Sequence, residues 1–427
     1  MRRSGWVLLV LGAAAFVWPA TARADDRAGE PMPRVSRSGY DRVPVIGGPD
    51  SVQSSLREHD GVKHTTFYRG SVIKDAIDPY YRFKRRMKKR HGLAFGFDFN
   101  MLYQGATAGL TDDQASGGVF RLYAQWTVIG RGGPTSSVIV ARIEHRHRYW
   151  TDLSPSELSP AIGSLFKTAN SFDSWGWGLT NLQWQQLFAK GRYAIAIGQV
   201  DLRDWVDTFE LAGWRTMLLG AATTYPTNPL PAAGLGASAH AYFRERNTPY
   251  VQAGFSDANG KPYDPSFESA FDVAEFYSYV ELGWTPAFEK RSKRNLRLTY
   301  WHQDARTAEG KPEAWGLSFS GAWRFGTTFS PFLRAGYAHG GVAPSEVGVV
   351  AGVGYHHRSH DVLGLAVGWG RPWETELRDQ TTIELFYRLQ ISQNVGITPD
   401  LELIVDPSKN PDEDVIAVLS LRIQFAF

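Results

Sequence analysis

From Leu93 onward, hydrophobic and polar residues alternate along the chain with a period of two. The first segment places apolar side chains on one face and polar ones on the other. The apolar positions are Leu93, Phe95, Phe97, Phe99, Met101 and Tyr103, and the polar ones are Asp98, Asn100 and Gln104. Because successive side chains of a β-strand point to opposite faces, the pattern predicts a strand with one apolar and one polar face.

The same alternation recurs about sixteen times, in segments of roughly 9–15 residues, a length that suits a tilted strand crossing a membrane. After residue 24, no apolar run is long enough for a membrane helix. The predicted strands are 93–104, 120–128, 139–148, 174–188, 191–201, 235–246, 248–256, 271–285, 294–306, 313–325, 328–338, 345–357, 361–371, 379–391, 394–406 and 413–427.

The connections between these segments alternate in length. Short ones occur at 131–134, 189–191, 246–247, 326–327, 358–359 and 392–394. The intervening connections tend to be longer, and 151–173 and 202–234 are the longest. Short periplasmic turns, longer external loops and an even strand number are typical of outer-membrane barrels. The fold class that we predict is all-β, an antiparallel transmembrane β-barrel of about sixteen strands with both ends in the periplasm.

Charged residues on the polar face argue against a soluble β-sandwich. Arg142, Glu144, Arg146 and Arg148 follow one another on one strand face. In a dry core, each unpaired charge would cost several kcal/mol. In a water-filled lumen the cost is small, which favours a wide barrel.

The segment 413–427 alternates without interruption, and its apolar register runs from Val415 to Phe427. We interpret it as the strand that closes the barrel. Ile423, Phe425 and Phe427 would then face lipid and act as the assembly signal for the barrel-assembly machinery.

The first 91 residues differ from the rest. Arg2 and Arg3, an apolar stretch and Ala22-Arg23-Ala24 predict a cleaved signal peptide at 1–24. Residues 25–91 are expected to form a short periplasmic segment, irregular up to about residue 75, before a barrel domain at 92–427. Asp78-Pro79 predicts the start of a basic helix, 80–91, ended by Gly92. Its role is left open between a plug or collar at the channel mouth and a solvated helix.

Composition narrows the remaining chemistry. After residue 24 the chain has 43 basic and 43 acidic residues, so its charge gives no indication of nucleic-acid binding. The absence of Cys excludes disulfides and thiolate chemistry. His145 and His147 could chelate a metal at i, i+2 spacing, but on the outward register we interpret them as membrane-interface residues. We therefore expect no metal and no cofactor.

Several stretches carry a family resemblance. In the last third these are Thr382–Arg388, Ile397–Ile404, Asn410-Pro411 and the terminal strand; further back they are Trp184–Phe188, Lys190–Arg192, Ala196–Asp201 and the Pro-rich 226–231. The chain resembles the carbohydrate-selective porins of Gram-negative outer membranes (glucose-porin or OprB type). Gln199 stands where that family commonly has a basic residue, and its entry motif is poorly kept around 70–85. Both differences concern selectivity more than fold.

The resemblance implies a sixteen-stranded barrel that passes monosaccharides such as glucose by diffusion. Such a path requires hydrogen-bonding groups, aromatic surfaces and weak binding. The inward residues expected to line it are Arg121, Arg142, Glu144, Arg146, Asp201, Glu275, Tyr277, Tyr279, Arg297, Trp301, Arg334, Glu384 and Arg388. Each could instead be part of an ion pair that holds the wall in shape, and the loop 202–234 could fold inward to narrow the channel.

The sequence leaves three alternatives to compare. A structural or exporter barrel would need a large periplasmic assembly domain, and residues 25–91 are too short and too polar to form one. A general or ion-selective channel would share the barrel, whereas a barrel lipase or protease would need a paired Ser/His or Asp/His set, and no convincing set is present. The preferred sugar and the choice between a monomer and a homotrimer are not determined by the sequence.

Overall fold

The computed structural model describes Tyr40, residues 46–61, Lys63, Thr66, residues 71–358 and residues 360–427, without the side chains of residues 71–76. All of them fall within one compact unit of the chain. The predicted signal peptide at 1–24 lies outside the described residues.

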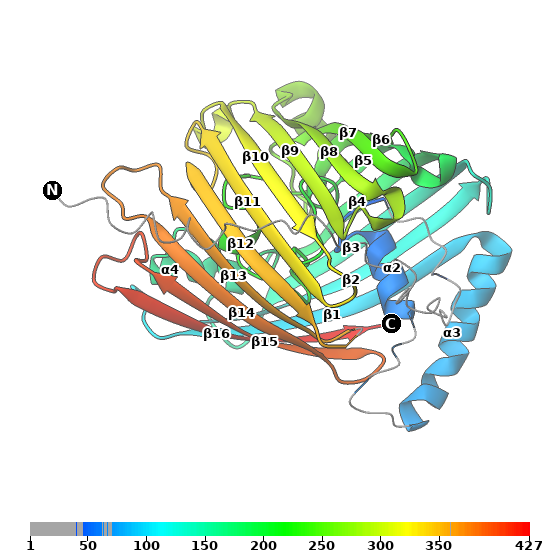
Figure 1. Ribbon diagram of the computed structural model, residues 1–427, viewed down its shortest axis with the longest axis horizontal. Coiled ribbons are helices and arrows are strands. Elements are labelled where there is room, and N and C mark those ends of the chain that lie inside the picture. Colours follow the sequence, from blue (N-terminus) through cyan, green and yellow to red (C-terminus); the bar gives the residue numbers. More distant parts are fainter. Residues whose placement is uncertain (1–39, 41–45, 62, 64–65, 67–70, 359) are drawn as a thin grey trace, which may run out of the picture. The chain divides into compact units, whose positions relative to one another are not determined.

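Sixteen antiparallel strands form a closed barrel in which each strand pairs with its neighbours in sequence and β1 pairs with β16 (Figure 1). The strands are β1 (Leu93–Ala106), β2 (Gln114–Ile129), β3 (Ser136–Arg148), β4 (Gly176–Phe188), β5 (Tyr193–Val200), β6 (Gly234–Tyr242), β7 (Arg246–Asp257), β8 (Phe276–Ala287), β9 (Arg294–Gln303), β10 (Ala314–Trp323), β11 (Phe329–His339), β12 (Val347–His356), β13 (Val362–Arg371), β14 (Gln380–Gln390), β15 (Val395–Val405) and β16 (Val415–Ala426). The predicted fold class is confirmed, and most strand bounds are correct to within a few residues.

Burial alternates along each strand in the sense opposite to that of a soluble protein. On β16, Leu419 is 63% exposed, whereas Arg422 is 2% exposed. On β1, Asp98 and Asn100 are buried, whereas Phe97 and Phe99, which alternate with them, are half-buried. The outer surface is therefore an apolar band, and the polar register faces the lumen, as the alternation predicted.

The two ends of the barrel differ. One end, here called the turn rim, carries the short connections β2–β3, β4–β5, β6–β7, β8–β9, β10–β11, β12–β13 and β14–β15. The other end, the loop rim, carries the long connections 149–175, 201–233 and 258–275. This alternation agrees with the predicted topology, in which the turn rim is periplasmic.

The barrel closes where β16 meets β1. Phe425 pairs with Phe99 and Ile423 with Met101 in the antiparallel register. Beyond the last pair, the backbone of Phe427 exchanges two hydrogen bonds with Phe97, at 2.9 and 3.0 Å, and the two rings stack at 5.1 Å. The closing-strand interpretation is confirmed, whereas the assembly signal stays a prediction.

The segment before the barrel is more ordered than we expected. Residues Val52–Asp60 form the helix α2, capped by Ser51, whose hydroxyl accepts a hydrogen bond from the Ser54 N–H. The expectation of irregular structure up to about residue 75 is therefore wrong for residues 52–60 and 71–75. A Ser N-cap directly before an apolar residue favours a helix start, and this signal was present in the sequence.

The predicted basic helix begins earlier than Asp78. The helix α3 spans Ser71–His91 and contains Pro79 in its interior, so the Asp78-Pro79 start is wrong. An interior Pro removes one helical hydrogen bond; here Tyr80 and Tyr81 follow it and are packed against the protein. Gly92, at φ +74°, ends the helix as predicted. None of the described helices is both long and apolar enough to cross a membrane.

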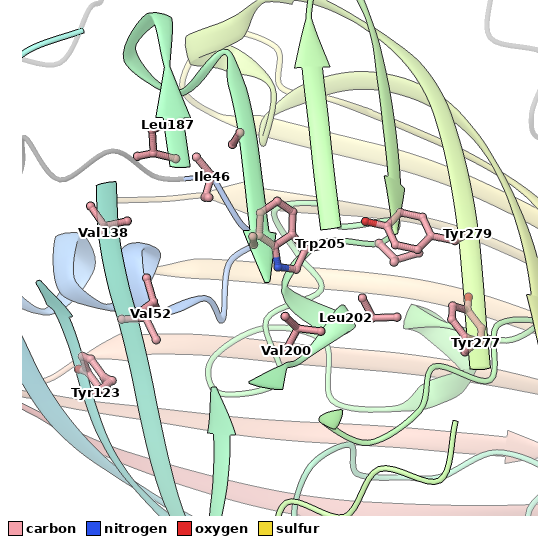
Figure 2. Packing of buried hydrophobic residues seen from close by; sticks show 14 of the residues in the cluster. Ile46, Val52, Tyr123, Val138, Leu187, Val200, Leu202, Trp205, Tyr277 and Tyr279 are labelled. Carbon is pink, nitrogen blue, oxygen red and sulfur yellow. The ribbon is translucent and has the colours of Figure 1, made fainter. Parts of the chain in front are cut away.

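Apolar side chains also gather inside the barrel. Figure 2 shows Leu202 and Trp205 of the 201–233 connection in one cluster with Tyr277 and Tyr279 of β8. Val52 of α2 belongs to the same cluster. The core of this protein therefore forms where segments inserted in the lumen meet the wall.

Candidate functional site

The connection 201–233, here called the inner loop, lies within the lumen. Its Asp207 forms an ion pair with Arg334 of β11, and the Asp207 N–H donates to Glu281 of β8 at 2.9 Å. The Leu219 N–H donates to Glu384 of β14 at 2.5 Å. Because these contacts reach three strands far apart around the barrel, the loop folds inward, the arrangement that its composition allowed.

The inner loop is also fixed to β16 and β7. Arg422 donates from Nη1 to the carbonyl of Trp214 at 2.7 Å. Gln252 donates to the carbonyl of Trp205, also at 2.7 Å. These two side chains come from the polar register of their strands, so the wall itself supplies donors for the unpaired carbonyls of the loop.

The helix α2 occupies another part of the lumen. Gln53 donates to Gln185 of β4 at 2.8 Å, and Glu58 forms an ion pair with Arg388 of β14. Strands β4 and β14 lie six steps apart around a sixteen-stranded barrel. A helix with side chains that reach both strands extends across most of the lumen.

Backbone and charge contacts fix the start of α2. Arg121 and Arg142 both donate to the carbonyl of Asp50, each at 3.2 Å. The Asp50 carboxylate accepts from Arg215 of the inner loop at 2.7 Å and from the Trp214 N–H at 3.1 Å. The start of α2 is thus held by the wall on one side and the inner loop on the other.

Titratable groups of α2 are perturbed by this burial. Burial lowers the pKa of His59 well below its ordinary value of 6.5. The positive charge of Arg215 lowers it further, and the negative charge of Asp98 opposes the shift without reversing it. Burial raises the pKa of Asp50 despite the neighbouring Arg215. For Glu58, burial is outweighed by Arg388 and Arg215, which lower its pKa well below the usual 4.5. Because these pKa values differ from the ordinary ones when α2 is docked, we expect docking to depend on pH.

The charged side chains predicted on β3 form ion pairs with one another and with neighbouring carboxylates. Arg142 contacts Glu144 at 3.0 Å and Asp201 at 2.7 Å. Arg146 contacts Glu144 at 2.6 Å and Asp173 at 2.9 Å. These four predicted residues (Arg142, Glu144, Arg146 and Asp201) are therefore brought together in the lumen, and each has a charged partner.

A cavity opens beside this row, with about 540 Å³ of empty space that includes open solvent. The side chains around it come from β3, the start of α2, the connection 149–175 and the inner loop. They include Arg142, Arg146, Asn170, Asp201, Arg203, Asp204, Trp214 and Tyr225. Charged groups, an amide and two aromatic rings thus surround one space between the wall and the inner segments.

One carboxyl of this cavity is set to titrate near neutrality. Burial raises the pKa of Asp204 to about 6, although the positive charge of Arg142 opposes the shift. The negative charges of Asp201 and Asp50 act in the same direction as burial. Its carboxylate lies 3.4 Å from Arg142. The charge of the cavity therefore changes across mildly acidic pH.

The remaining predicted residues lie elsewhere around the wall. On the far side from β3, Tyr277 donates to Asn228 of the inner loop at 2.7 Å and stacks on Trp301 at 6.0 Å. Tyr279 shares a hydrogen bond with Ser238. Arg297 lies 3.6 Å from Glu281. Arg121, Arg334, Glu384 and Arg388 carry the contacts given above, so all of these face inward but contact protein groups.

Two expectations about these residues need correction. Glu275 is not on a strand, because β8 begins at Phe276; it accepts from Thr307 at 2.6 Å and from Asn259 at 2.8 Å, joining loops at the loop rim. Arg388 was expected to sit in lumen water, yet its side chain is 6% exposed and paired. The sequence pattern reports which face a residue occupies and cannot report the segment that covers it.

Sequence reasoning missed the groups supplied by the inner segments. These are Asp50, Glu58, Asp204, Asp207 and Arg215. They lie outside the strands, where no period marks their direction. The only signal available was the Ser51 N-cap for the first two.

Among the described residues, no group of three or more His, Asp or Glu side chains converges as a metal site. His145 and His147 lie on the outer surface with ring nitrogens 3.0 Å apart and contact Trp177 and Tyr149. That setting agrees with the interpretation of both as interface residues.

Comparison with known proteins supports the family resemblance found in the sequence. Residues 317–427 match the model of the carbohydrate-selective porins, OprB family. The resemblance to this family is confirmed. The matched region comprises β11–β16 and most of β10, which includes the closing strand.

Curated relatives include Porin AaxA of Chlamydia abortus, 24% identical over 300 residues, which are 65% of this chain and 63% of the relative. Porin AaxA of Chlamydia felis is 24% identical over 306 residues, which are 65% and 64% of the two chains. This chain therefore spans less than two thirds of the length of either relative.

Among solved structures, OprB of Pseudomonas putida at high pH superposes with a TM-score of 0.60 at 15% identity, covering 80% of this chain and 96% of that one. At such identity the likeness concerns the fold alone. It shows that the barrel fold of this chain resembles the fold of that protein.

Proposed function

We propose that this protein is an outer-membrane porin through which small carbohydrates diffuse. The observation that carries the proposal is a closed sixteen-stranded barrel with an apolar outer band and a charged lumen, in a chain whose residues 317–427 match the carbohydrate-selective porin model. Monosaccharides such as glucose are the substrate class. The proposal assigns no catalytic step to the chain.

The cavity beside β3 is the proposed point of solute contact. A neutral sugar gives up water as it enters a constriction, so the wall must supply donors and acceptors in its place. Arg203 and Asp201 offer both types, and Trp214 and Tyr225 offer flat surfaces. The exposed fraction of the Arg203 side chain is 39%, so it can reach a solute without leaving its own contacts.

A second candidate is a general or ion-selective channel. Strong ion selectivity requires unbalanced charge along the path. The lumen charges here are largely paired, as Arg142 is with Asp201 and Arg146 is with Glu144. Because paired charges produce a weak net field, the arrangement favours passage of neutral solutes.

Single-channel recording in planar bilayers tests the proposal. We expect stepwise conductance and a concentration-dependent reduction of current by glucose and related sugars. Arg203→Gln should weaken this block, whereas Arg371→Gln, a change on the exposed outward register of β13, should not. Conductance with no sugar effect in the parent protein would favour the general channel, and the absence of conductance would contradict both.

The cellular setting is proposed with the function. We infer export by the 1–24 signal peptide, insertion by the barrel-assembly machinery, and contact of the apolar band with outer-membrane lipid. A homotrimer remains an alternative to a monomer. Cross-linking of intact cells through single introduced Cys residues on the outer band would separate the two, because the chain has no Cys of its own.

A further inference from the structure

The helix α3 lies across the turn rim of the barrel, alongside the strand ends (Figure 1). Tyr81 accepts a hydrogen bond from Asn394, in the β14–β15 turn, at 2.8 Å. At the C-terminal end of the helix, Arg131 of the β2–β3 turn donates to the carbonyls of Arg90 at 3.0 Å and His91 at 2.6 Å. Anchors in two turns fix the helix along the rim.

One side of α3 continues the lipid-facing band of the barrel. The ring of Tyr80 contacts Phe95 and Phe97, both at 6.2 Å, and Phe83 contacts Phe95 at 5.8 Å. Phe95 and Phe97 belong to the outward register of β1, and Phe97 stacks on Phe427. The Phe83 side chain nevertheless remains 44% exposed. The apolar side of the helix is therefore joined to the outer band but not covered by protein.

The adjacent side of α3 is basic. Arg82, Arg86, Lys89 and Arg90 are all exposed, and no ion pair of these side chains occurs among the described residues. At 3.6 residues per turn they fall within about 100° of arc, directly beside Phe83. The third side, at Lys84, contacts Asp60 at the end of α2. The helix thus presents protein-facing, apolar and cationic sides in that order around its axis.

We propose that α3 lies at the headgroup level of the leaflet around the turn rim and binds anionic phospholipid headgroups through this cationic side. The inference rests on the proposed membrane location of the barrel. A helix with an apolar side at the acyl boundary and an Arg/Lys side toward the headgroups has the architecture of interfacial helices. Guanidinium groups match phosphate geometry, and clustered cations near a surface attract anionic lipid.

A solvated helix is the competing interpretation, and the two differ in lipid dependence. A solvated helix gains nothing from placing Phe83 and four unpaired cations side by side. At the rim, the same arrangement buries the ring in the acyl boundary and pairs the cations with phosphates. The contact between the helix and the outward register of β1 favours the membrane.

The test places a bimane fluorophore on a single Cys introduced at exposed His91, in the otherwise Cys-free chain, reconstituted in vesicles. Vesicles contain phosphatidylcholine and phosphatidylglycerol, with bromine on the acyl chains of one lipid or the other. Brominated phosphatidylglycerol should quench about threefold more strongly than brominated phosphatidylcholine at equal fraction, and 0.5 M salt should reduce the difference.

The matched variants each remove four cations. In the rim variant, Arg82, Arg86, Lys89 and Arg90 become Gln, and the lipid preference should disappear. In the control, Arg148, Lys261, Arg371 and Lys409 of the loop rim become Gln, and the preference should persist. Equal quenching by both lipids in the parent, or a preference that survives in the rim variant, would overturn the inference.

Failure of the inference and failure of the proposed function are distinguishable. If neither brominated lipid quenches the fluorophore, α3 is away from the bilayer and the inference is wrong. The conductance of the same vesicle preparation, fused to planar bilayers, then shows whether the channel proposal stands by itself.

Discussion

The ion pair between Glu58 and Arg388 should control whether α2 stays in the lumen. The side chains are 23% and 6% exposed, and Glu58 also lies 3.7 Å from Arg215. Replacing Glu58 with Gln leaves Arg388 without this ion-pair partner in a largely buried position. Removing one partner of a buried pair costs about 3–5 kcal/mol. Because Glu58 is partly exposed, we take the lower end, about 3 kcal/mol, which corresponds to roughly 150-fold in the docking equilibrium.

Thiol accessibility measures this equilibrium directly. Val52 is 1% exposed, in an apolar cluster of α2 with wall residues such as Tyr123 and Val138. A Cys introduced there should react with a polar maleimide only when the helix leaves its site. Glu58→Gln should raise the labelling rate about 100-fold, with higher single-channel conductance. The double variant with Arg388→Gln should recover part of the loss, since a coupled pair is non-additive.

The control is Glu268→Gln, an exposed carboxylate in the 258–275 connection. It removes the same charge and should leave both readouts unchanged. A labelling rate for Glu58→Gln within threefold of the parent would refute the reasoning, because the pair would then not hold α2. A rise in labelling without a rise in conductance would show that α2 does not narrow the path.

Three further predictions concern the titration of His59, the closing strand and the topology of the barrel. The pKa of His59 is lowered in the docked state, so below pH 6.5 the imidazole binds a proton more readily when α2 is undocked. Docking should therefore weaken as the pH falls below 6.5, by about 1.4 kcal/mol at pH 5.5. His59→Gln should abolish this pH dependence of the labelling rate. Deleting Phe427 removes its two backbone bonds to Phe97, so the heat-modifiable folded band in membrane fractions should decrease. On whole cells, a Cys at Pro160 should be labelled and one at Lys190 should not; the reverse would invert the topology.

The barrel could be predicted from the sequence because its signal is local and repeated. Each strand of a wide barrel has one lipid-facing and one lumen-facing register, so Phe97 and Asp98 already indicate their faces. Pairing each strand with its neighbour in sequence then requires no long-range information. Closure by β16 followed from the same register, and the structure places Phe425 opposite Phe99.

The contents of the lumen could not be predicted in the same way. The inner loop and α2 meet the wall through single contacts such as Gln53 with Gln185 and Asp207 with Arg334. These partners are 132 and 127 residues apart in sequence, and no periodic pattern relates them. A polar residue on the inward register gives the same sequence pattern whether its side chain contacts water or an inserted segment.

The two inserted segments differ in what holds them. The inner loop buries many apolar side chains, among them Leu202, Trp205 and Phe209, and their burial is favourable without any single partner. The helix α2 buries only Val52 and Leu56 as aliphatic residues, and apart from the ring contact of His59 with Tyr123 its other contacts are mainly hydrogen bonds and ion pairs. Polar contacts give a modest net free energy because water replaces them when they break.

Of the two inserted segments, we therefore expect α2 and not the inner loop to leave the lumen more readily. Opening the lumen by moving α2 costs a small set of polar contacts, each of which lumen water can replace, while the barrel ladder and the loop core stay intact. A change in pH acts on the charges of His59 and Glu58, and both shifts weaken docking as protons are added. The raised pKa of Asp50 acts in the opposite sense, so the pH at which α2 leaves is set by the balance of these three groups.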